Sequence, residues 1–155
     1  MNPAFTLTLD DGAVQIEGCA VRIEPGLTKA AAANAFARFY KSAVDHKNGY
    51  EWIYLDGLSF GGVPGAMALC FHEGLIREIN WSADAPGGQL EDGWPTQEAI
   101  DREIAFVRRV LAKLMGEKTF SGHRKFAWGE LWSTFDAKGF TASSGLRYKA
   151  GAAPA

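Results

Sequence analysis

The sequence predicts an α+β protein, in which a mostly antiparallel β-sheet carries two helices on one side. Short runs that alternate apolar and polar residues are separated by Asp-Gly and Gly turns, which is typical of antiparallel strands. Two other segments repeat their apolar residues at helical spacing. Runs of strands interrupted by only two helices favour this class over a regular alternation of strand and helix. The expected order is β-β-α-β-β-β-α-β-β.

Two strands are expected near the N-terminus. Segment 5–9 (FTLTL) alternates apolar and hydroxyl residues and is followed by Asp-Asp-Gly. Segment 13–25 continues the alternation on either side of Gly18, until Pro25-Gly26 ends it.

The first helix is expected over 29–44. Thr28 is a suitable N-cap, and the alanine run that follows has high helix propensity. The apolar residues at spacings of three and four form one face: Ala32, Phe36, Phe39 and Ala43.

Three strands should follow. Segment 50–57 places three aromatic residues on one side (Tyr50, Trp52, Tyr54) and two aliphatic residues on the other (Ile53, Leu55). Segment 65–74 is almost continuously hydrophobic, which predicts a central strand, and 75–82 is its expected hairpin partner. The glycine- and proline-rich segment 57–65 is predicted to be a loop.

A second helix is expected to begin after Pro95-Thr96 and to end at Gly116. Its apolar stripe consists of Ile100, Ile104, Val107, Leu111 and Leu114. Two last strands, 125–135 and 140–148, are expected to form a hairpin in which Gly139 supplies a positive φ.

The bulk composition fits one globular domain over 1–149 with a flexible tail at 150–155. The 155 residues are 47% hydrophobic and 22% charged. A net charge of -2 does not favour a nucleic-acid partner. No apolar run is long enough for a membrane span and no secretion signal is recognisable, so a cytoplasmic location is expected. There, Cys19 and Cys70 would be reduced; in an exported protein they could pair.

The residues do not predict catalytic, cofactor or metal chemistry. Cys70 and His72 share a strand face roughly 7 Å apart, too far for a direct thiol–imidazole hydrogen bond. The three histidines lie in separate segments without metal-ligand spacing, and no phosphate-binding glycine motif is present. An alternative is a ligand pocket under the 57–65 loop, formed by His72, Glu73 and Glu130.

Charge is distributed unevenly along the chain. Between Arg77 and Arg102 there is no Lys or Arg, whereas acids are frequent and Trp94 is the aromatic residue of the loop. An acidic loop with an aromatic anchor suits docking onto a basic cleft, and the candidates are Asp84, Glu91, Asp92 and Trp94. The alternative is structural: the acids favour the N-terminus of the second helix, and Trp94 covers the start of that helix.

The segment FAWGELWSTFD, residues 126–136, places Trp128, Glu130 and Trp132 on one face of a continuous strand. If this face is buried, Glu130 must be paired or protonated. If it is exposed, the two tryptophans beside an acid suit a binding surface. Gly129 predicts a bulge or a close approach by another backbone.

Residues 126–148, FAWGELWSTFDAKGFTASSGLRY, resemble bacterial immunity proteins of contact-dependent and type VI secretion systems. The resemblance implies a cytoplasmic protein without enzymatic activity that binds a cognate toxin tightly and blocks its active site. Partner contacts are predicted at Asp84, Glu91, Asp92, Trp94, Trp128, Glu130 and Trp132. Two alternatives remain: a small-ligand-binding protein or enzyme, and a structural or assembly subunit of a secretion apparatus. A homodimer is compatible with the sequence.

Overall fold

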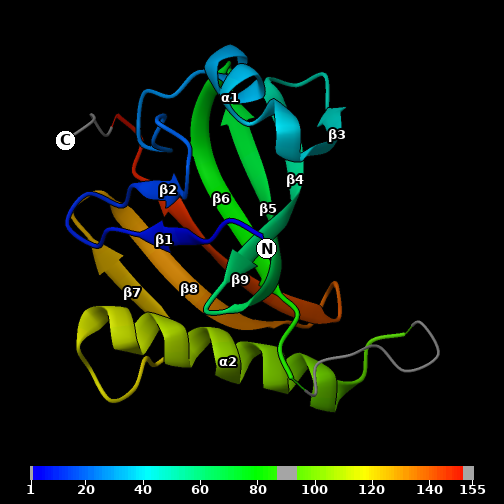
Figure 1. The fold of residues 1–155 in the computed structure, drawn as a ribbon, viewed down its shortest axis with the longest axis vertical. Helices are drawn as coiled ribbons and strands as arrows, with labels where there is room; N and C mark the ends of the chain where they lie inside the picture. Colours follow the sequence, from blue (N-terminus) through cyan, green and yellow to red (C-terminus); the bar gives the residue numbers. More distant parts are fainter. Residues whose placement is uncertain (1, 87–93, 152–155) are drawn as a thin grey trace.

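The computed structural model describes residues 2–86 and 94–151, which form a seven-stranded sheet, a two-stranded hairpin and two α-helices (Figure 1). The elements are β1 (Phe5–Leu7), β2 (Val14–Ile16), α1 (Lys29–Ala35), the 3-10 turn η1 (Ala37–Phe39), β3 (Tyr40–Asp45), β4 (Tyr50–Phe60), β5 (Val63–His72), β6 (Leu75–Ala83), α2 (Gln97–Met115), β7 (His123–Phe126), β8 (Gly129–Asp136) and β9 (Thr141–Tyr148). The predicted α+β class is confirmed.

The large sheet is antiparallel throughout, in the order β3-β4-β5-β6-β9-β8-β7. Two meanders, β3 to β6 and β7 to β9, therefore meet where β6 pairs with β9. The helix α2 connects the two meanders along the chain (Figure 1). β5 lies inside the sheet between β4 and β6, as its hydrophobic run predicts, but its outer residues Ala66 and Ala68 are only half-buried.

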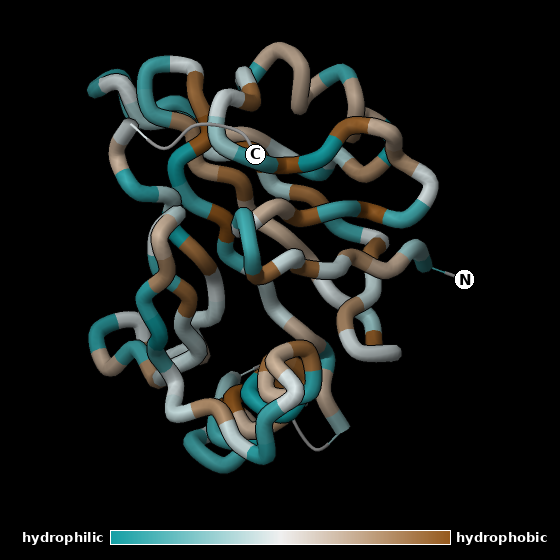
Figure 2. The backbone as a smooth tube through the Cα atoms, turned by 90° about the vertical axis from the view of Figure 1, so that its left-hand side faces the viewer, coloured by the Kyte–Doolittle hydropathy of each residue, from teal (hydrophilic) through white to brown (hydrophobic). Residues whose placement is uncertain are grey.

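One face of the sheet, here called the inner face, is covered. The hairpin β1–β2, α1 and α2 all contribute side chains to the same hydrophobic core as this face. Leu131 and Leu146 of the sheet and Val107 of α2 are completely buried in it. Figure 2 shows the resulting alternation of hydrophobic and hydrophilic residues along the strands, with α2 seen end-on below them.

The second helix agrees with the sequence at both ends. The Thr96 hydroxyl accepts a hydrogen bond from the Ala99 N–H (3.1 Å), and Gly116 ends the helix in the left-handed conformation with φ 67°. The predicted stripe is buried from Ile100 to Leu111, whereas Leu114 is 41% exposed.

The first helix is shorter than predicted. It begins after Thr28 but ends at Ala35, and residues 40–45 form the edge strand β3 instead of a last helical turn. Pairing of this segment with β4 overrides the helical spacing, and its Ser and Val residues favour a helix only weakly. Ala32, Phe36 and Phe39 still face the core.

The prediction of a loop at 57–65 is wrong, because the glycines of this segment form the bulge and the turn of a β-hairpin. Gly57 lies at a β-bulge, where the register shifts between Leu55 and Leu58. Gly61 and Gly62 both have positive φ and form the two-residue turn between β4 and β5. The glycines therefore connect two long strands without an intervening loop.

The predicted strand 125–135 is divided into β7 and β8 by a turn at residues 127–128. In the following hairpin the positive φ belongs to Phe140 (48°), and not to Gly139. The Asp136 carboxylate accepts hydrogen bonds from the N–H groups of Lys138 and Gly139, which stabilises this turn by local side-chain contacts.

No helix in residues 2–86 and 94–151 is long and apolar enough to cross a membrane. Cys19 and Cys70 are both free thiols.

Candidate partner-binding surface

The opposite face of the large sheet, here called the outer face, carries no helix in the described part of the chain. Its side chains alternate with those of the core and are half-buried or exposed, apart from Cys70 and Gly145. The face includes Tyr50, Trp52 and Tyr54 of β4, Ala66, Ala68 and Cys70 of β5, Glu78, Asn80 and Ser82 of β6, His123 and Lys125 of β7, Glu130, Trp132 and Thr134 of β8, and Ser143, Gly145 and Arg147 of β9.

The strand register arranges these residues in rows across the sheet. One row runs Trp52, Cys70, Glu78, Arg147, Glu130, Lys125. The next row runs Tyr54, Ala68, Asn80, Gly145, Trp132, His123. Residues that are far apart in the sequence thus become direct neighbours on one surface.

Charged groups occupy the centre of the first row. The Arg147 guanidinium contacts Glu78 at 2.7 Å and Glu130 at 3.5 Å, so that one cation lies between two carboxylates. The hydrogen bond with Glu78 is the main cause of the raised pKa of Arg147. Glu130 also lies 3.4 Å from His123 Nε2. The cluster is solvent-accessible and fixes side-chain positions more than it stabilises the fold.

Trp132 is held in place by two residues of β9, Ser143 and Arg147, which lie in the rows on either side of its own. Its indole N–H donates to the Ser143 hydroxyl (3.0 Å), and the Arg147 guanidinium lies 5.5 Å from its ring centroid. A large aromatic ring with few accessible rotamers loses little entropy when a partner packs on it. Trp132 is therefore held in a fixed orientation with part of its ring accessible.

A second aromatic group lies on the other side of the face. Tyr50, Trp52 and Tyr54 share the outer side of β4, as predicted, with Trp52 and Tyr54 stacked at 6.2 Å between centroids. Tyr50 stacks on His72 at 4.4 Å. Ile53 and Leu55 point into the core. Trp, Tyr and Arg are the residue types enriched at interface hot spots.

Between the two aromatic groups the surface is depressed, because the side chains in the middle of the outer face are small. Ala66, Ala68 and Gly145 lie between Tyr54 and Trp132, which are four strand spacings, or roughly 19 Å, apart. A Cβ on Gly145 would collide with the Ile79 carbonyl oxygen and lie 2.6 Å from Asn80 Oδ1. Glycine is required there by the close packing of β6 against β9.

The seven predicted contact residues fall into separate places. Glu130 and Trp132 lie in neighbouring rows of the outer face. Asp84 is exposed just after the end of β6. Trp94 is 75% exposed, so it does not cover the start of α2. Glu91 and Asp92 lie outside the described residues.

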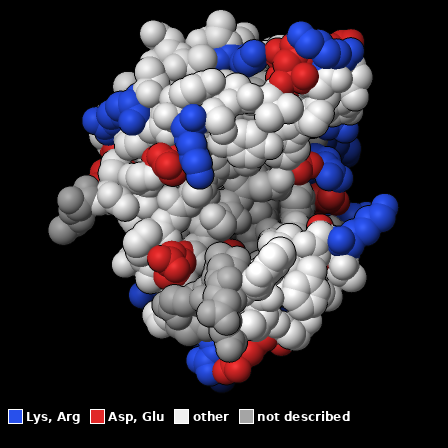
Figure 3. Space-filling model, turned by 90° about the vertical axis from the view of Figure 1, so that its right-hand side faces the viewer, with Lys and Arg blue, Asp and Glu red and all other residues white. Residues whose placement is uncertain are grey.

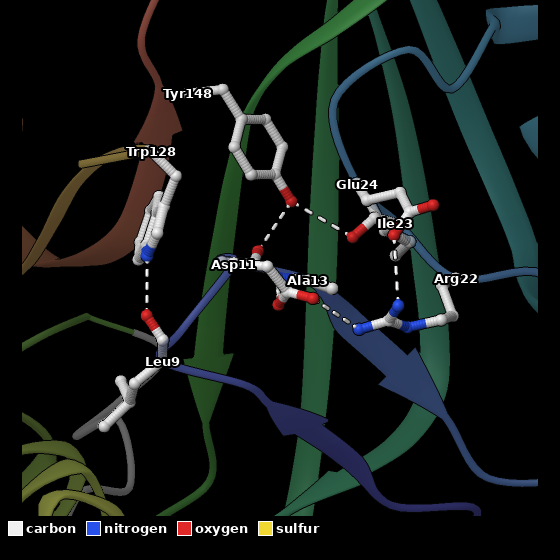
Figure 4. Close-up of polar contacts among 9 residues, drawn as sticks. Leu9, Asp11, Ala13, Arg22, Ile23, Glu24, Trp128 and Tyr148 are labelled. Atoms are coloured by element: carbon white, nitrogen blue, oxygen red, sulfur yellow. Dashed lines mark hydrogen bonds and ion pairs between the residues drawn. The ribbon is translucent and has the colours of Figure 1, made fainter. Parts of the chain in front are cut away.

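Trp128 is in the core, because the turn at 127–128 takes it off the face of β8. It is 7% exposed, and its indole N–H donates to the Leu9 carbonyl at 2.7 Å (Figure 4). It stacks on Phe126 at 5.0 Å between centroids. Trp128 is therefore a buried anchor for the N-terminal segment and not a surface contact.

Tyr148 is the second anchor of this segment. Its hydroxyl lies 2.8 Å from the Gly12 carbonyl oxygen and 3.1 Å from that of Ile23 (Figure 4). Burial raises the pKa of Tyr148, so the hydroxyl stays a donor. Beside it, Arg22 pairs with Asp11 at 2.9 Å. Burial opposes ionisation of Asp11, but the Ala13 N–H and Arg22 outweigh it and lower the pKa of Asp11.

Gly129 marks a close backbone approach, as predicted. Its φ is 155°, and a Cβ on this residue would collide with the Arg147 carbonyl oxygen. Glycine at this position lets β8 begin immediately after Trp128 while remaining paired with β9.

The alternative pocket of His72, Glu73 and Glu130 does not form. His72 and Glu73 line a hollow of about 310 Å³ beside Pro25 and Tyr148, to which Glu130 does not contribute. The predicted covering loop is a turn at the opposite end of β5. Cys70 faces outward next to Glu78, and burial raises the pKa of its thiol to about 11, which disfavours a nucleophilic thiolate.

No protein-family model matches this sequence, and no curated protein is significantly similar to it. Its fold is similar to that of one chain from the solved structure of Rhs1-CT in complex with its cognate immunity protein RhsI1. The TM-score is 0.54 at 8% sequence identity, over 94% of this chain and 88% of that chain. At this identity the likeness concerns the fold, and either member of the complex could be the chain that it matches.

Most of the outer face was not identified from the sequence. Alternation along single strands grouped Tyr50, Trp52 and Tyr54, and it also grouped Glu130 and Trp132. The pairing of β6 with β9, which brings Glu78 next to Arg147, joins residues 69 positions apart and has no local signal.

Proposed function

We propose that this chain is a cytoplasmic immunity-type protein, which binds a cognate bacterial toxin through its outer face and neutralises it by covering the toxin's active site. The observation that carries the proposal is the outer face itself. It presents Trp52, Tyr54, Trp132 and a positioned Arg147 on a sheet that no helix covers in the described residues. An uncovered surface of this composition is typical of a protein-binding site.

The likeness to a chain from a toxin–immunity complex supports the same class of function. The resemblance of residues 126–148 to immunity proteins adds support from the sequence, and Trp132 and Arg147 lie within that segment. Both lie on the outer face.

The test uses the polypeptide encoded by the gene adjacent to this one as the partner. We expect the wild-type chain to bind it, and Trp132→Ala to weaken binding at least tenfold, which corresponds to about 1.4 kcal/mol. Trp94→Ala is the matched control, because it removes an exposed tryptophan outside the outer face. Circular dichroism would confirm that both variants remain folded.

Three outcomes would contradict parts of the proposal. Weaker binding by Trp94→Ala with unchanged Trp132→Ala would move the surface to the neighbourhood of Trp94. No binding of the adjacent polypeptide by the wild-type chain would remove the immunity role. Growth arrest in bacteria that express this chain alone, relieved by the adjacent gene, would assign it as the toxin of the pair.

A further inference from the structure

The outer face continues into a groove that reaches the start of α2. Three hollows follow one another along it, with volumes of about 370, 240 and 390 Å³. The first, beside Trp132, shares Asn80 with the second. The second shares Ala66 and Ser82 with the third, beside Asp84 and Glu103. We call these three hollows together the groove. Figure 3, which shows the right-hand side of the molecule as seen in Figure 1, has a hollow near its middle with charged side chains of both signs around it.

The groove is negatively charged. Its carboxylates are Asp56, Glu78, Asp84, Glu103 and Glu130, and its cations are Lys41 and Arg147, with His123 at one end. Arg147 is already engaged by Glu78 and Glu130. At the end near α2, Asp56, Asp84 and Glu103 line a hollow to which no Lys, Arg or His contributes among the described residues.

Two groups in the groove favour a hydrogen-bond donor or a cation. Asn80 Oδ1 is buried beside Gly145 and has no hydrogen-bond partner among the residues that the structure describes. An acceptor left without a donor costs free energy. Burial raises the pKa of Glu103, and the nearby Asp84 carboxylate raises it further. A hydrogen bond from the Ala83 N–H (3.4 Å) opposes this shift without cancelling it. A cation placed beside Glu103 would reverse this effect.

We infer that the groove receives a protruding basic segment of the partner, whose Lys or Arg side chains reach Asp84 and Glu103 while its apolar part packs between Tyr54 and Trp132. This inference rests on the proposed function and specifies its geometry. The partner supplies the protrusion and this chain supplies the concave surface, in contrast to an acidic loop that enters a basic cleft. The small residues Ala66, Ala68 and Gly145 leave the depth that such a segment needs.

The test compares two double variants that each remove two negative charges. Asp84→Asn with Glu103→Gln changes the groove, and Glu17→Gln with Glu73→Gln changes exposed acids elsewhere. With the adjacent polypeptide as partner, we expect the groove variant to lose at least tenfold in affinity and to depend less steeply on salt. The control variant should change less than threefold. Equal losses in both variants would overturn the inference, since a net-charge effect alone would explain them.

A measurement without the partner separates the two hypotheses. Titration of the wild-type chain with a hepta-arginine peptide should shift the backbone amide NMR signals of Asn80, Ser82 and Asp84, and the groove variant should lose these shifts. A hepta-glutamate peptide should produce none. Arginine-induced shifts elsewhere, or none at all, would overturn the basic-segment inference. If instead the shifts appear in the groove while the adjacent polypeptide does not bind, the proposed function fails and the preference of the groove for cations stands.

Discussion

The two faces of the large sheet are built from the same strands but differ in how far they are buried. On β5, β6 and β8 the inner residues Leu69, Ile79 and Leu131 are 0% exposed. Their neighbours in sequence on the outer face are Ala68, Asn80 and Trp132, which remain partly accessible. Each strand therefore contributes to the core on one side and leaves the other side accessible to solvent.

The difference shows why aromatic content alone is a poor guide to function. Trp81 and Trp128 are 5% and 7% exposed and belong to the core, where burial of apolar area stabilises the fold. Trp52 and Trp132 leave part of their rings accessible to a partner. Only the position of a tryptophan relative to the sheet distinguishes the two roles.

The largest expected contrast between the faces is between two adjacent residues of β8. Leu131→Ala should lower the free energy of unfolding by about 2–5 kcal/mol, because it leaves a cavity in a close-packed core. Trp132→Ala should cost about 1 kcal/mol, because it removes a half-buried ring and one hydrogen bond. Urea denaturation of both variants measures the difference. Equal losses would show that the outer face is covered in solution.

A smaller effect is expected at Tyr148, which fastens the N-terminal segment to β9. Tyr148→Phe should cost about 1–3 kcal/mol, because the buried carbonyls of Gly12 and Ile23 lose a donor. Tyr54→Phe is the matched control on the outer face and should stay within about 0.5 kcal/mol. A loss at Tyr148 no larger than at Tyr54 would mean that water replaces the hydroxyl and that this anchor contributes little.

The sequence predicted the fold class and α2 because their signals are local. Thr96, Gly116 and the apolar stripe between them define a helix without reference to the rest of the chain. The glycines at 57–65 were misread because the same residues form loops, bulges and tight turns. The edge strand β3 was missed because its pairing with β4 overrides local propensity.

The candidate surface was only partly predictable for a related reason. Alternation correctly separated Leu131 from Trp132, but it assigned Trp128 to the same face because the turn at 127–128 was not recognised. The rows that join Trp52 to Arg147 depend on strand order, which no single segment specifies. The groove therefore became visible only when the seven strands were placed side by side.

The smallest expected effect is that of Glu103→Gln. This substitution should raise the stability of the chain but lower its affinity for the partner. The folded-state pKa of Glu103 is raised above the ordinary value of 4.5, mainly by burial. The wild-type chain therefore loses stability as the pH rises from the unfolded-state pKa through the folded-state pKa. Glu103→Gln keeps an acceptor for the Ala83 N–H but carries no charge, so it escapes this loss.

We therefore expect Glu103→Gln to melt slightly above the wild type at pH 7, and the gap to vanish below about pH 4, where both chains are neutral at this site. The same variant should bind the adjacent polypeptide less tightly, because it gives up a carboxylate that would face a cation. Thermal melts from pH 3 to 8, together with one affinity measurement, test both signs. A variant that is less stable than the wild type at pH 7 would show that the charged Glu103 carboxylate gains more from contacts within this chain, such as the Ala83 N–H, than its burial costs. In that case the Glu103 carboxylate contributes to the stability of this chain and no partner cation is needed to stabilise it.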